Sequence, residues 1–233
     1  MILPLFVWAC IQGIGCNAGS TTPETRPAMA NAAAPLAPVS FDPQDDPRGG
    51  DIVMREMGPL QGKVVADMFA GDGYYTWKLL SAGARVLAID DDPAAIERLQ
   101  AWKASQGIGD DRLLIRLTTP GVPGLLPDEA DIALVTREYS TLGDRRSWIT
   151  QLMAGIKSPH LFYLVNYLPG QSPDGPPLSQ RMDYNQVSEE LTLFGADDVG
   201  ISYKKLPYRY ILFASKPPLM PEEEAGPSGD AGH

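Results

Sequence analysis

Residues 64–76, VVADMFAGDGYYT, constrain the fold of this chain most strongly, because a short apolar run leads directly into two closely spaced glycines. The apolar run predicts a buried β-strand, and the amphipathic residues 74–82 predict a helix. Gly71 and Gly73 permit backbone dihedrals that a side chain forbids, and they let a ligand approach the backbone. The following helix presents unpaired N–H groups to the loop. Asp67 lies near the end of the strand, where open α/β sheets bind their ligands.

A second apolar run, residues 85–90, ends in Asp90. A carboxylate in that position can accept hydrogen bonds from both hydroxyls of a ribose. A nicotinamide-binding domain would show the pattern G-x-G-x-x-G. Gly71 and Gly73 are not followed by the third, helix-side glycine, because residues 74–76 are Tyr-Tyr-Thr. A dinucleotide site therefore stays open only as an alternative.

These two motifs resemble the class I S-adenosylmethionine (SAM)-dependent methyltransferases, whose first motif reads roughly acid-x-Gly-x-Gly-x-Gly and whose second strand ends in an acid. The resemblance implies SAM as the cofactor. It implies that Gly71 and Gly73 let the methionine part approach, that Asp67 meets its amino group directly or through water, and that Asp90 binds the ribose hydroxyls. In the alternative interpretation the glycines serve turn geometry alone and Asp90 caps the following helix.

The resemblance extends over residues 51–216, where the order of elements is similar to a bacterial subgroup of these proteins. In that subgroup the fourth strand leads into Tyr-His-His, and the last strand is entered through Leu-Pro-Tyr-aromatic. Residues 206–210, LPYRY, carry the second feature. Tyr139 matches the tyrosine of the first feature, whereas Ser140 and Thr141 replace both histidines.

The replacement of the histidines limits the chemistry available at this position. Ser140 and Thr141 do not titrate near neutral pH, so they cannot replace an imidazole general base. The two histidines of the chain are His160, at the start of a predicted strand, and the terminal His233. Methyl transfer does not always need a base, however, because alignment of the nucleophile with the methyl group can supply most of the acceleration. No catalytic residue is assigned.

Two further positions depart from the pattern. Phe69 stands where the first motif usually has its first glycine, a change that some methyltransferases also carry. After the third strand the resemblance implies an Asp or Asn for the adenine amino group. Residues 118–120 are Thr-Thr-Pro instead, and a hydroxyl is a weaker acceptor than a carboxylate.

Four side chains are candidates for the substrate side of the site. Arg137 and Glu138 follow the fourth strand, where a functional role competes with a structural salt bridge. Tyr139 could pack on the cofactor or substrate, or lie in the core. Asn166 ends the fifth strand. The long Pro/Gly/Ser segment 167–182 is a candidate functional loop, because loops of this length are uncommon inside compact domains.

The remaining pattern predicts an α/β fold of the Rossmann-like class I methyltransferase type. We expect a seven-stranded, mostly parallel sheet with helices on both faces, closed by a hairpin whose final strand is inserted antiparallel. Asp51, the pair Asp91-Asp92 ahead of Pro93, and Asp183 are predicted helix N-caps. The predicted strands are residues 63–69, 85–90, 112–117, 131–136, 161–166, 199–204 and 208–214. The predicted helices are residues 48–57, 74–82, 146–156, a segment that begins at Pro93 and a segment after Asp183.

Charge disfavours a nucleic-acid partner. The formal net charge is −10, but eight of the acidic residues and one arginine lie outside residues 48–216. No cluster of Lys and Arg larger than a pair appears, so the electrostatic footprint of a nucleic-acid-binding protein is missing. Residues 48–216 contain no cysteine, which argues against a thiolate metal site and a cysteine nucleophile there. No metal is expected.

Residues 1–16 resemble the signal of a bacterial lipoprotein. Residues 2–14 are uncharged and mostly apolar, too short to span a bilayer but suited to a signal-peptide core. A small residue precedes Cys16, the expected lipidation site, whereas Cys10 would leave too short a core. The absence of a preceding Lys or Arg, and Gly13 where Leu is preferred, depart from the pattern. The alternatives are a misassigned start codon, which implies a cytoplasmic protein, or a buried N-terminal strand.

The remaining flanks have compositions typical of disorder. Residues 17–47 are rich in Ala, Pro, Ser and Thr, which predicts a tether between an exported, membrane-anchored leader and the domain. Residues 217–233 form an acidic tail rich in Pro, Glu and Gly. The methyltransferase-like domain is expected at residues 48–216.

Two functions from different classes follow. The first is a SAM-dependent methyltransferase that acts on an unidentified small molecule or protein. The second is a membrane-tethered binding or structural domain that kept the fold and lost the chemistry. The missing histidines and adenine acid favour the second function, as does a leader that implies a compartment where SAM is not expected. The methyl acceptor and the oligomeric state are not predicted.

Overall fold

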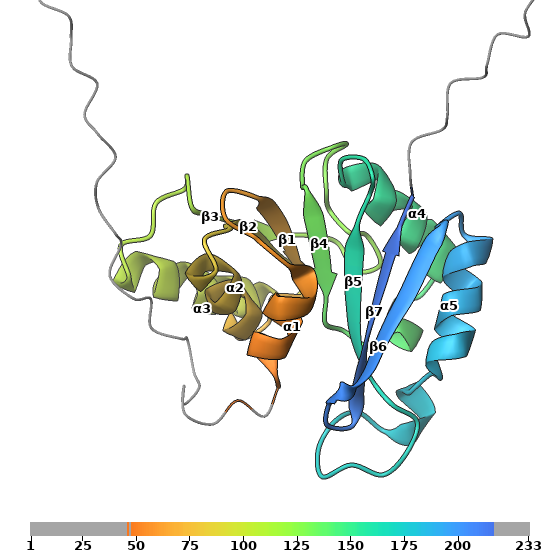
Figure 1. The fold of residues 1–233 in the computed structure, drawn as a ribbon. Coiled ribbons are helices and arrows are strands. Elements are labelled where there is room, and N and C mark those ends of the chain that lie inside the picture. Colours follow the sequence, from red (N-terminus) through yellow and green to blue (C-terminus); the bar gives the residue numbers. More distant parts are fainter. Residues whose placement is uncertain (1–45, 47, 217–233) are drawn as a thin grey trace, which may run out of the picture. The chain divides into compact units, whose positions relative to one another are not determined.

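A computed structural model describes residue 46 and residues 48–216, and all statements below concern these residues. They contain a seven-stranded sheet in the order β3-β2-β1-β4-β5-β7-β6 (Figure 1). The strands are β1 (Val64–Met68), β2 (Arg85–Asp90), β3 (Leu113–Leu117), β4 (Ile132–Val135), β5 (Phe162–Tyr167), β6 (Asp198–Leu206) and β7 (Arg209–Ser215).

The sheet is parallel from β1 to β5, and β7 is inserted antiparallel between β5 and β6. The predicted seven-stranded, mostly parallel sheet with an inserted hairpin strand is therefore confirmed. Strand order reverses next to β1, because β2 and β3 continue on one side whereas β4 and β5 continue on the other. The carboxyl ends of β1 and β4 thus form the topological switch point, where open α/β sheets bind ligands.

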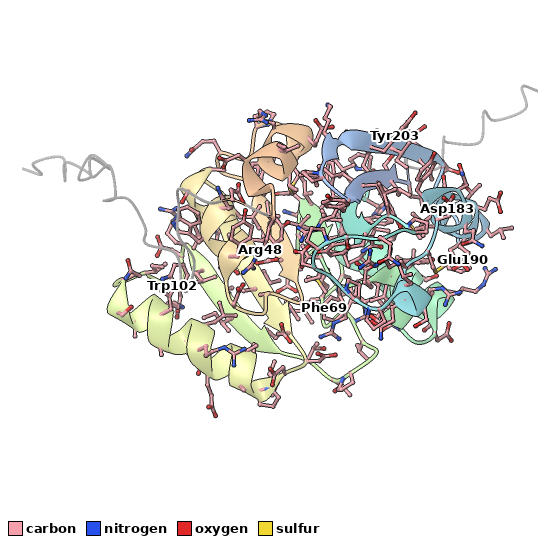
Figure 2. All side chains as sticks on the ribbon, turned by 90° about the horizontal axis from the view of Figure 1, so that it is seen from below. Arg48, Phe69, Trp102, Asp183, Glu190 and Tyr203 are labelled. Carbon is pink, nitrogen blue, oxygen red and sulfur yellow. The ribbon has the colours of Figure 1, made fainter. Side chains whose placement is uncertain are left out.

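Helices cover both faces of the sheet (Figure 1). Side chains alternate along each strand, so neighbouring residues of β1 enter different cores. The helices are α1 (Gly50–Met57), α2 (Tyr74–Ser81), α3 (Pro93–Ser105), α4 (Arg145–Gly155) and α5 (Tyr184–Leu193), with short 3₁₀ turns η1 (Tyr139–Thr141) and η2 (Leu178–Gln180). Val65 packs in the core under α1, α2 and α3, whereas Ala66 packs in the core under α4 and α5. Trp102 of α3 and Glu190 of α5 accordingly lie on opposite sides of the molecule (Figure 2).

Short polar side chains start three of the helices. The Asp92 carboxylate accepts a hydrogen bond from Ala94 N at the start of α3, and Asp183 does the same for Asn185 N at the start of α5. The predicted cap at Asp183 is confirmed, and of the predicted pair Asp91 and Asp92 it is Asp92 that caps α3. Asp144, which was not predicted, caps α4 by accepting from Ser147 N.

The predicted cap of the first helix is wrong. Gly49, in the left-handed region with φ 66°, occupies the N-cap position of α1, and Asp51 lies inside the first turn. The reason is that Asp46 already supplies a carboxylate to Gly50 N and Asp51 N, at 3.3 and 3.4 Å. The Asp51 carboxylate is free to bind Lys78 Nζ of α2 at 2.7 Å.

Within the described part of the chain, no helix combines the length and apolar character needed to cross a membrane. The leader, including Cys16 and Cys10, most of the tether and the acidic tail lie outside the described residues.

The unpredicted cap gives a test of the fold. Asp144→Ala removes the acceptor for an unpaired N–H of α4 and should lower the free energy of unfolding by about 1 kcal/mol. Urea denaturation measures the change. Thr150→Ala on the exposed side of the same helix is the control and should not destabilise, since alanine has the higher helix propensity. Equal losses in the two variants would refute the cap.

Candidate functional site

The loop after β1 turns sharply through three left-handed residues, Phe69, Gly71 and Gly73, with φ values of 62°, 57° and 81°. A Cβ built on Gly71 would approach only the Phe69 carbonyl oxygen, at an ordinary 3.6 Å. The backbone dihedral, and not a lack of space, therefore requires glycine at position 71. Gly73 is the N-cap of α2, so this turn directs the loop into the helix.

Asp90 fastens this loop to the neighbouring strand. One carboxylate oxygen accepts from Gly71 N at 2.8 Å, and the other accepts from Asp92 N at 2.9 Å. The residue is only 2% exposed. The alternative role of Asp90, capping the following helix, is observed only in part. Its carboxylate accepts from Asp92 N, but Asp92 itself is the N-cap of α3. Each carboxylate oxygen can accept a further hydrogen bond, and Asp90 lines a groove shared with Gly71 and Thr136.

Asp67, at the end of β1, is fully buried. Its Oδ2 accepts from Thr76 Oγ1 of α2 at 2.5 Å, whereas Oδ1 has no hydrogen-bond partner among the described residues. Burial raises the pKa of Asp67 to about 7, and the charges of Asp90 and Asp72 add to this while the Thr76 hydrogen bond opposes it. An orphaned buried acceptor is costly, and it is a position at which a ligand donor or a water would be stabilising.

Arg137 lies on the β2 side of the switch point. Its guanidinium forms two contacts with Asp91, at 2.6 and 2.7 Å, and lies 3.6 Å from the centre of the Phe69 ring. Phe69 in turn stacks on Trp148 of α4 at 5.7 Å. Hydrogen bonding to Arg137 lowers the pKa of Asp91. The structural salt bridge, the alternative stated for Arg137, is the arrangement observed, and the side chain also lines the grooves beside Asp90 and Pro120.

Tyr139 and Asn166 have structural roles and line neither the cavities nor the groove at the switch point. Tyr139 is fully buried, and its hydroxyl donates to Glu190 of α5 at 3.0 Å. Asn166, 1% exposed, accepts from Tyr139 N at 3.2 Å and donates to Arg137 O at 3.1 Å. Tyr139 thus takes the core position that was stated as its alternative, and the amide of Asn166 holds the turn after β4 in place.

The hydroxyls that replace the expected imidazoles are also engaged in structure. Ser140 Oγ donates to Gln180 O at 2.6 Å, and Thr141 Oγ1 donates to Glu138 O at 2.7 Å. His160 lies at the amino end of β5, on the opposite edge of the sheet, where Nδ1 contacts the Met153 and Ile156 carbonyl oxygens. No histidine of the described residues is near the switch point.

Glu138 is half-buried beside β5, and one carboxylate oxygen accepts from Tyr167 N at 3.1 Å. Burial raises the pKa of Glu138 to about 7, while the Tyr167 hydrogen bond and the charges of Arg181 and Arg209 oppose the shift. Glu138 therefore holds Tyr167 in position and titrates near neutral pH.

The segment 167–182 is folded around Tyr167. Arg181 donates to the carbonyl oxygens of Pro176, Gly170 and Asp174, at 2.9, 2.7 and 3.2 Å. The same guanidinium lies 4.9 Å from the Tyr167 ring. This segment is thus a folded loop that adjoins one side of the site.

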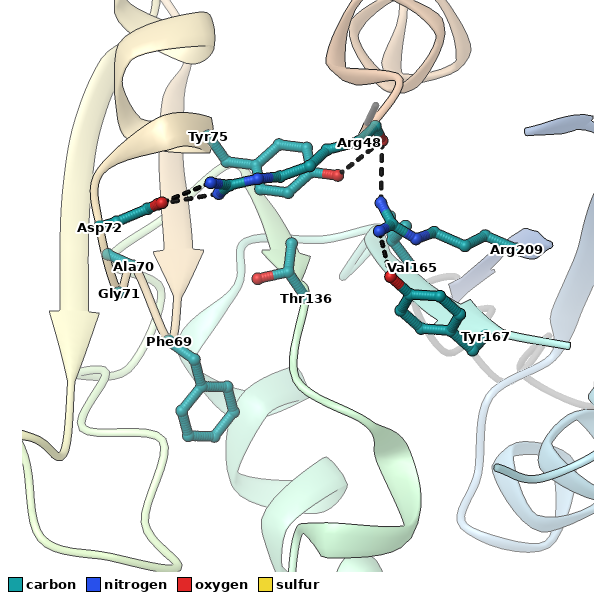
Figure 3. A pocket seen from close by; sticks show the side chains of 10 residues that line it. All are labelled: Arg48, Phe69, Ala70, Gly71, Asp72, Tyr75, Thr136, Val165, Tyr167 and Arg209. Carbon is teal, nitrogen blue, oxygen red and sulfur yellow. Dashed lines mark hydrogen bonds and ion pairs between the residues drawn. The ribbon is translucent and has the colours of Figure 1, made fainter. Parts of the chain in front are cut away.

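A cavity of about 220 Å³ extends from the glycine loop to β7 (Figure 3). The sequence did not predict Arg48, Thr136 or Arg209 as site residues. Arg209 was visible only as part of the LPYRY feature, and Arg48 only as the first residue of the expected domain. The lining residues are Arg48, Phe69, Ala70, Gly71, Asp72, Tyr75, Thr136, Val165, Tyr167 and Arg209.

A second cavity, of about 190 Å³, lies beyond the Arg137–Asp91 pair. Pro120 and Gly121, which follow β3, and Leu142 contribute to its wall. Thr118 does not line it, and its hydroxyl donates to Val122 O at 3.1 Å. Among the described residues no group of three His, Cys, Asp or Glu side chains could hold a metal ion.

The fold is the Rossmann-like fold of class I methyltransferases, as comparison with solved structures shows. A SAM-dependent methyltransferase from Aquifex aeolicus superposes with a TM-score of 0.66 at 19% identity, covering 75% of this chain and 93% of that one. A possible exported protein from Bordetella parapertussis superposes with a TM-score of 0.56 at 16% identity, covering 72% and 65%. No family model matches the chain.

Curated relatives match only a part of the chain. A ribosomal RNA small subunit methyltransferase H from Rhizobium leguminosarum bv. trifolii is 42% identical over 57 residues, 24% of this chain and 17% of the relative. A tRNA U34 carboxymethyltransferase from Shewanella sp. (strain ANA-3) is 36% identical over 76 residues, 32% and 23%. The chain thus spans less than a quarter of the length of either relative.

The raised pKa of Asp67 predicts a pH-dependent stability. Between about pH 4 and 7 the folded protein keeps a proton on Asp67 that the unfolded chain has lost, so stability falls as pH rises and levels off above 7. Asp67→Asn keeps an acceptor for Thr76 and removes this contribution, which is up to about 4 kcal/mol. Urea denaturation from pH 4 to 9 measures it. The exposed Glu189→Gln should retain the wild-type slope; an unchanged slope in Asp67→Asn would contradict the assignment.

Proposed function

We propose that this chain is a SAM-dependent methyltransferase whose acceptor is unidentified. The observation that carries the proposal is the buried Asp90 carboxylate, which holds the Gly71 N–H at the switch point of a class I methyltransferase fold. That placement brings a strand-end acid and a left-handed glycine loop to the same point, which is where a nucleoside ligand is expected.

The chain's own residues fit the parts of SAM in turn. The spare acceptor capacity of Asp90 suits the ribose hydroxyls, and the left-handed turn at Gly71 lets the methionine part approach the backbone. Asp67 is fully buried and lines none of these cavities, so its orphaned Oδ1 would meet the ammonium group through a water. The cavity walled by Pro120 and Leu142 suits the adenine, beside the Arg137–Asp91 pair.

SAM supplies an electrophilic methyl group bound to a sulfonium. The residues of this chain contribute orientation: Asp90 and the glycine loop fix one end of the cofactor, and the cavity of about 220 Å³ receives the acceptor next to it. Thr136 lies in the middle of this cavity, between the glycine loop and Arg209 (Figure 3). Because Ser140 and Thr141 are held in hydrogen bonds to carbonyl oxygens, we assign them no proton transfer.

We propose a small molecule or a protein as the acceptor. The two curated relatives are named for action on ribosomal RNA and tRNA, but they match less than a quarter of their own length. Residues 48–216 carry 18 basic and 21 acidic side chains, so they lack the positive charge that binds a nucleic-acid backbone.

The second candidate, a tethered binding domain without catalysis, has a specific observation in its favour. Both Asp90 oxygens already bind backbone N–H groups, and Arg137 occupies the space beside Asp91. A domain that kept the fold for stability alone would show this pattern. The resemblance of the chain's first residues to a lipoprotein signal agrees with it, as does the fold likeness to a possible exported protein.

Calorimetric titration of S-adenosylhomocysteine into the full chain separates the two candidates. We expect a Kd in the micromolar range, about −8 kcal/mol. Asp90→Ala should weaken binding at least about 100-fold, because it removes both the loop anchor and the ribose acceptor. Asp90→Asn, which keeps one acceptor, should have an affinity between those of the wild type and Asp90→Ala. Thermal melting checks that each variant is folded, and a folded wild-type protein that binds nothing at millimolar ligand would refute the enzyme.

We also propose that the leader is cleaved and Cys16 lipidated, which would place the domain on the outer side of a membrane. Cys16→Ser should abolish labelling with a radioactive fatty acid and release the protein from membranes, whereas Cys10→Ser should change neither. Recovery of the unlabelled, full-length wild-type chain from the cytoplasm would contradict the proposal and favour the misassigned start codon.

A further inference from the structure

Arg209 is the most buried of the arginines that lie within 4 Å of a carboxylate, yet no carboxylate lies within hydrogen-bond distance of its guanidinium. Its side chain is 11% exposed and lines the cavity of about 220 Å³ at the end away from the glycine loop (Figure 3). One terminal nitrogen donates to Arg48 O at 3.2 Å, and the other donates to the Tyr167 hydroxyl. The nearest carboxylate, that of Asp174, is 3.6 Å away.

Four other arginines provide an internal comparison. Each makes two close contacts with one carboxylate, and each is 31–35% exposed, about three times more than Arg209. These pairs are Arg48–Asp72, Arg116–Glu129, Arg137–Asp91 and Arg145–Glu190.

Compared with these four pairs, the burial of the Arg209 guanidinium is energetically unfavourable for the chain alone. Burial of a guanidinium is costly unless a carboxylate is directly bound, because neutral acceptors replace only part of the lost hydration. Asp174 does not remedy this, since its side chain is 59% exposed and it lies on the 167–182 loop. An anion that enters the cavity would complete the arrangement.

We propose that Arg209 binds a carboxylate of the methyl acceptor, so that the substrate is a small carboxylic acid or a molecule that presents one. A planar guanidinium matches a planar carboxylate with two parallel hydrogen bonds. This inference rests on the proposed function, since it places the carboxylate at the β7 end of the cavity and the cofactor at the Gly71 end.

Three neighbours support this subsite. Thr136 Oγ1 lies in the same cavity and has no hydrogen bond among the described contacts, so it can donate to the second carboxylate oxygen or to the acceptor. The Tyr167 ring, 4.4 Å from the Arg209 guanidinium, fixes that group in place. The Asp174 carboxylate would compete with an incoming carboxylate for Arg209, and the Tyr167 hydroxyl donates to it at 3.1 Å.

The test uses the full chain saturated with S-adenosylhomocysteine, with benzoate as the charged probe and benzamide as its neutral isostere. Saturation-transfer NMR measures both affinities. We expect benzoate to bind at least about 10-fold more tightly than benzamide, and Arg209→Gln to abolish this preference. Arg209→Lys keeps the charge without the fork and should retain part of it. Asp174→Asn removes the competitor, leaves an acceptor for Tyr167, and should tighten benzoate binding.

The controls separate this inference from the proposed function. Arg209→Gln should leave the affinities for S-adenosylhomocysteine and for methylthioadenosine, which lacks the amino-acid part, both unchanged. A selective loss for S-adenosylhomocysteine would mean that Arg209 binds the carboxylate of the cofactor, and would overturn the inference. Equal benzoate binding by wild type and a folded Arg209→Gln would overturn it too, as would no binding. If S-adenosylhomocysteine itself does not bind, the proposed function fails, while benzoate titration of the unloaded chain still tests Arg209.

Discussion

The hydrogen bonds of the buried Asp90 carboxylate determine how the carboxyl edge of the sheet is built. One oxygen holds the left-handed loop after β1 through Gly71 N, and the other holds the start of α3 through Asp92 N. The chain thereby satisfies two part-buried backbone donors. Any nucleoside that binds here shares an acid that the fold already needs, so loss of Asp90 affects both binding and structure.

The polar groups at the switch point form two sets, one on each side of Asp90. Toward β2, Arg137 joins Asp91 and covers Phe69, which stacks on Trp148. Toward β7, Arg209 and Tyr167 close the cavity under the folded 167–182 loop. The first set has its charges matched within the chain, whereas the second leaves a buried guanidinium without a carboxylate in direct contact. That asymmetry is the reason for assigning the cofactor to one side and an acidic acceptor to the other.

The sequence predicted what local chemistry determines. Apolar runs predicted the strands, short acids predicted the caps at Asp92 and Asp183, and glycine spacing predicted the turn. It did not predict what depends on long-range contacts. Asn166 and Tyr139 look like site residues until their partners are known. Arg209 and the Arg48 carbonyl are 161 residues apart in the chain, so no local pattern could bring them together.

A crystal structure of the full chain with S-adenosylhomocysteine tests the central claim most directly. We expect density for the ribose within hydrogen-bond distance of Asp90, the amino-acid part over Gly71, and the sulfur facing the cavity that ends at Arg209. Density at another edge of the sheet, or a soaked crystal with the Asp90–Gly71 loop unchanged and no ligand beside it, would contradict it.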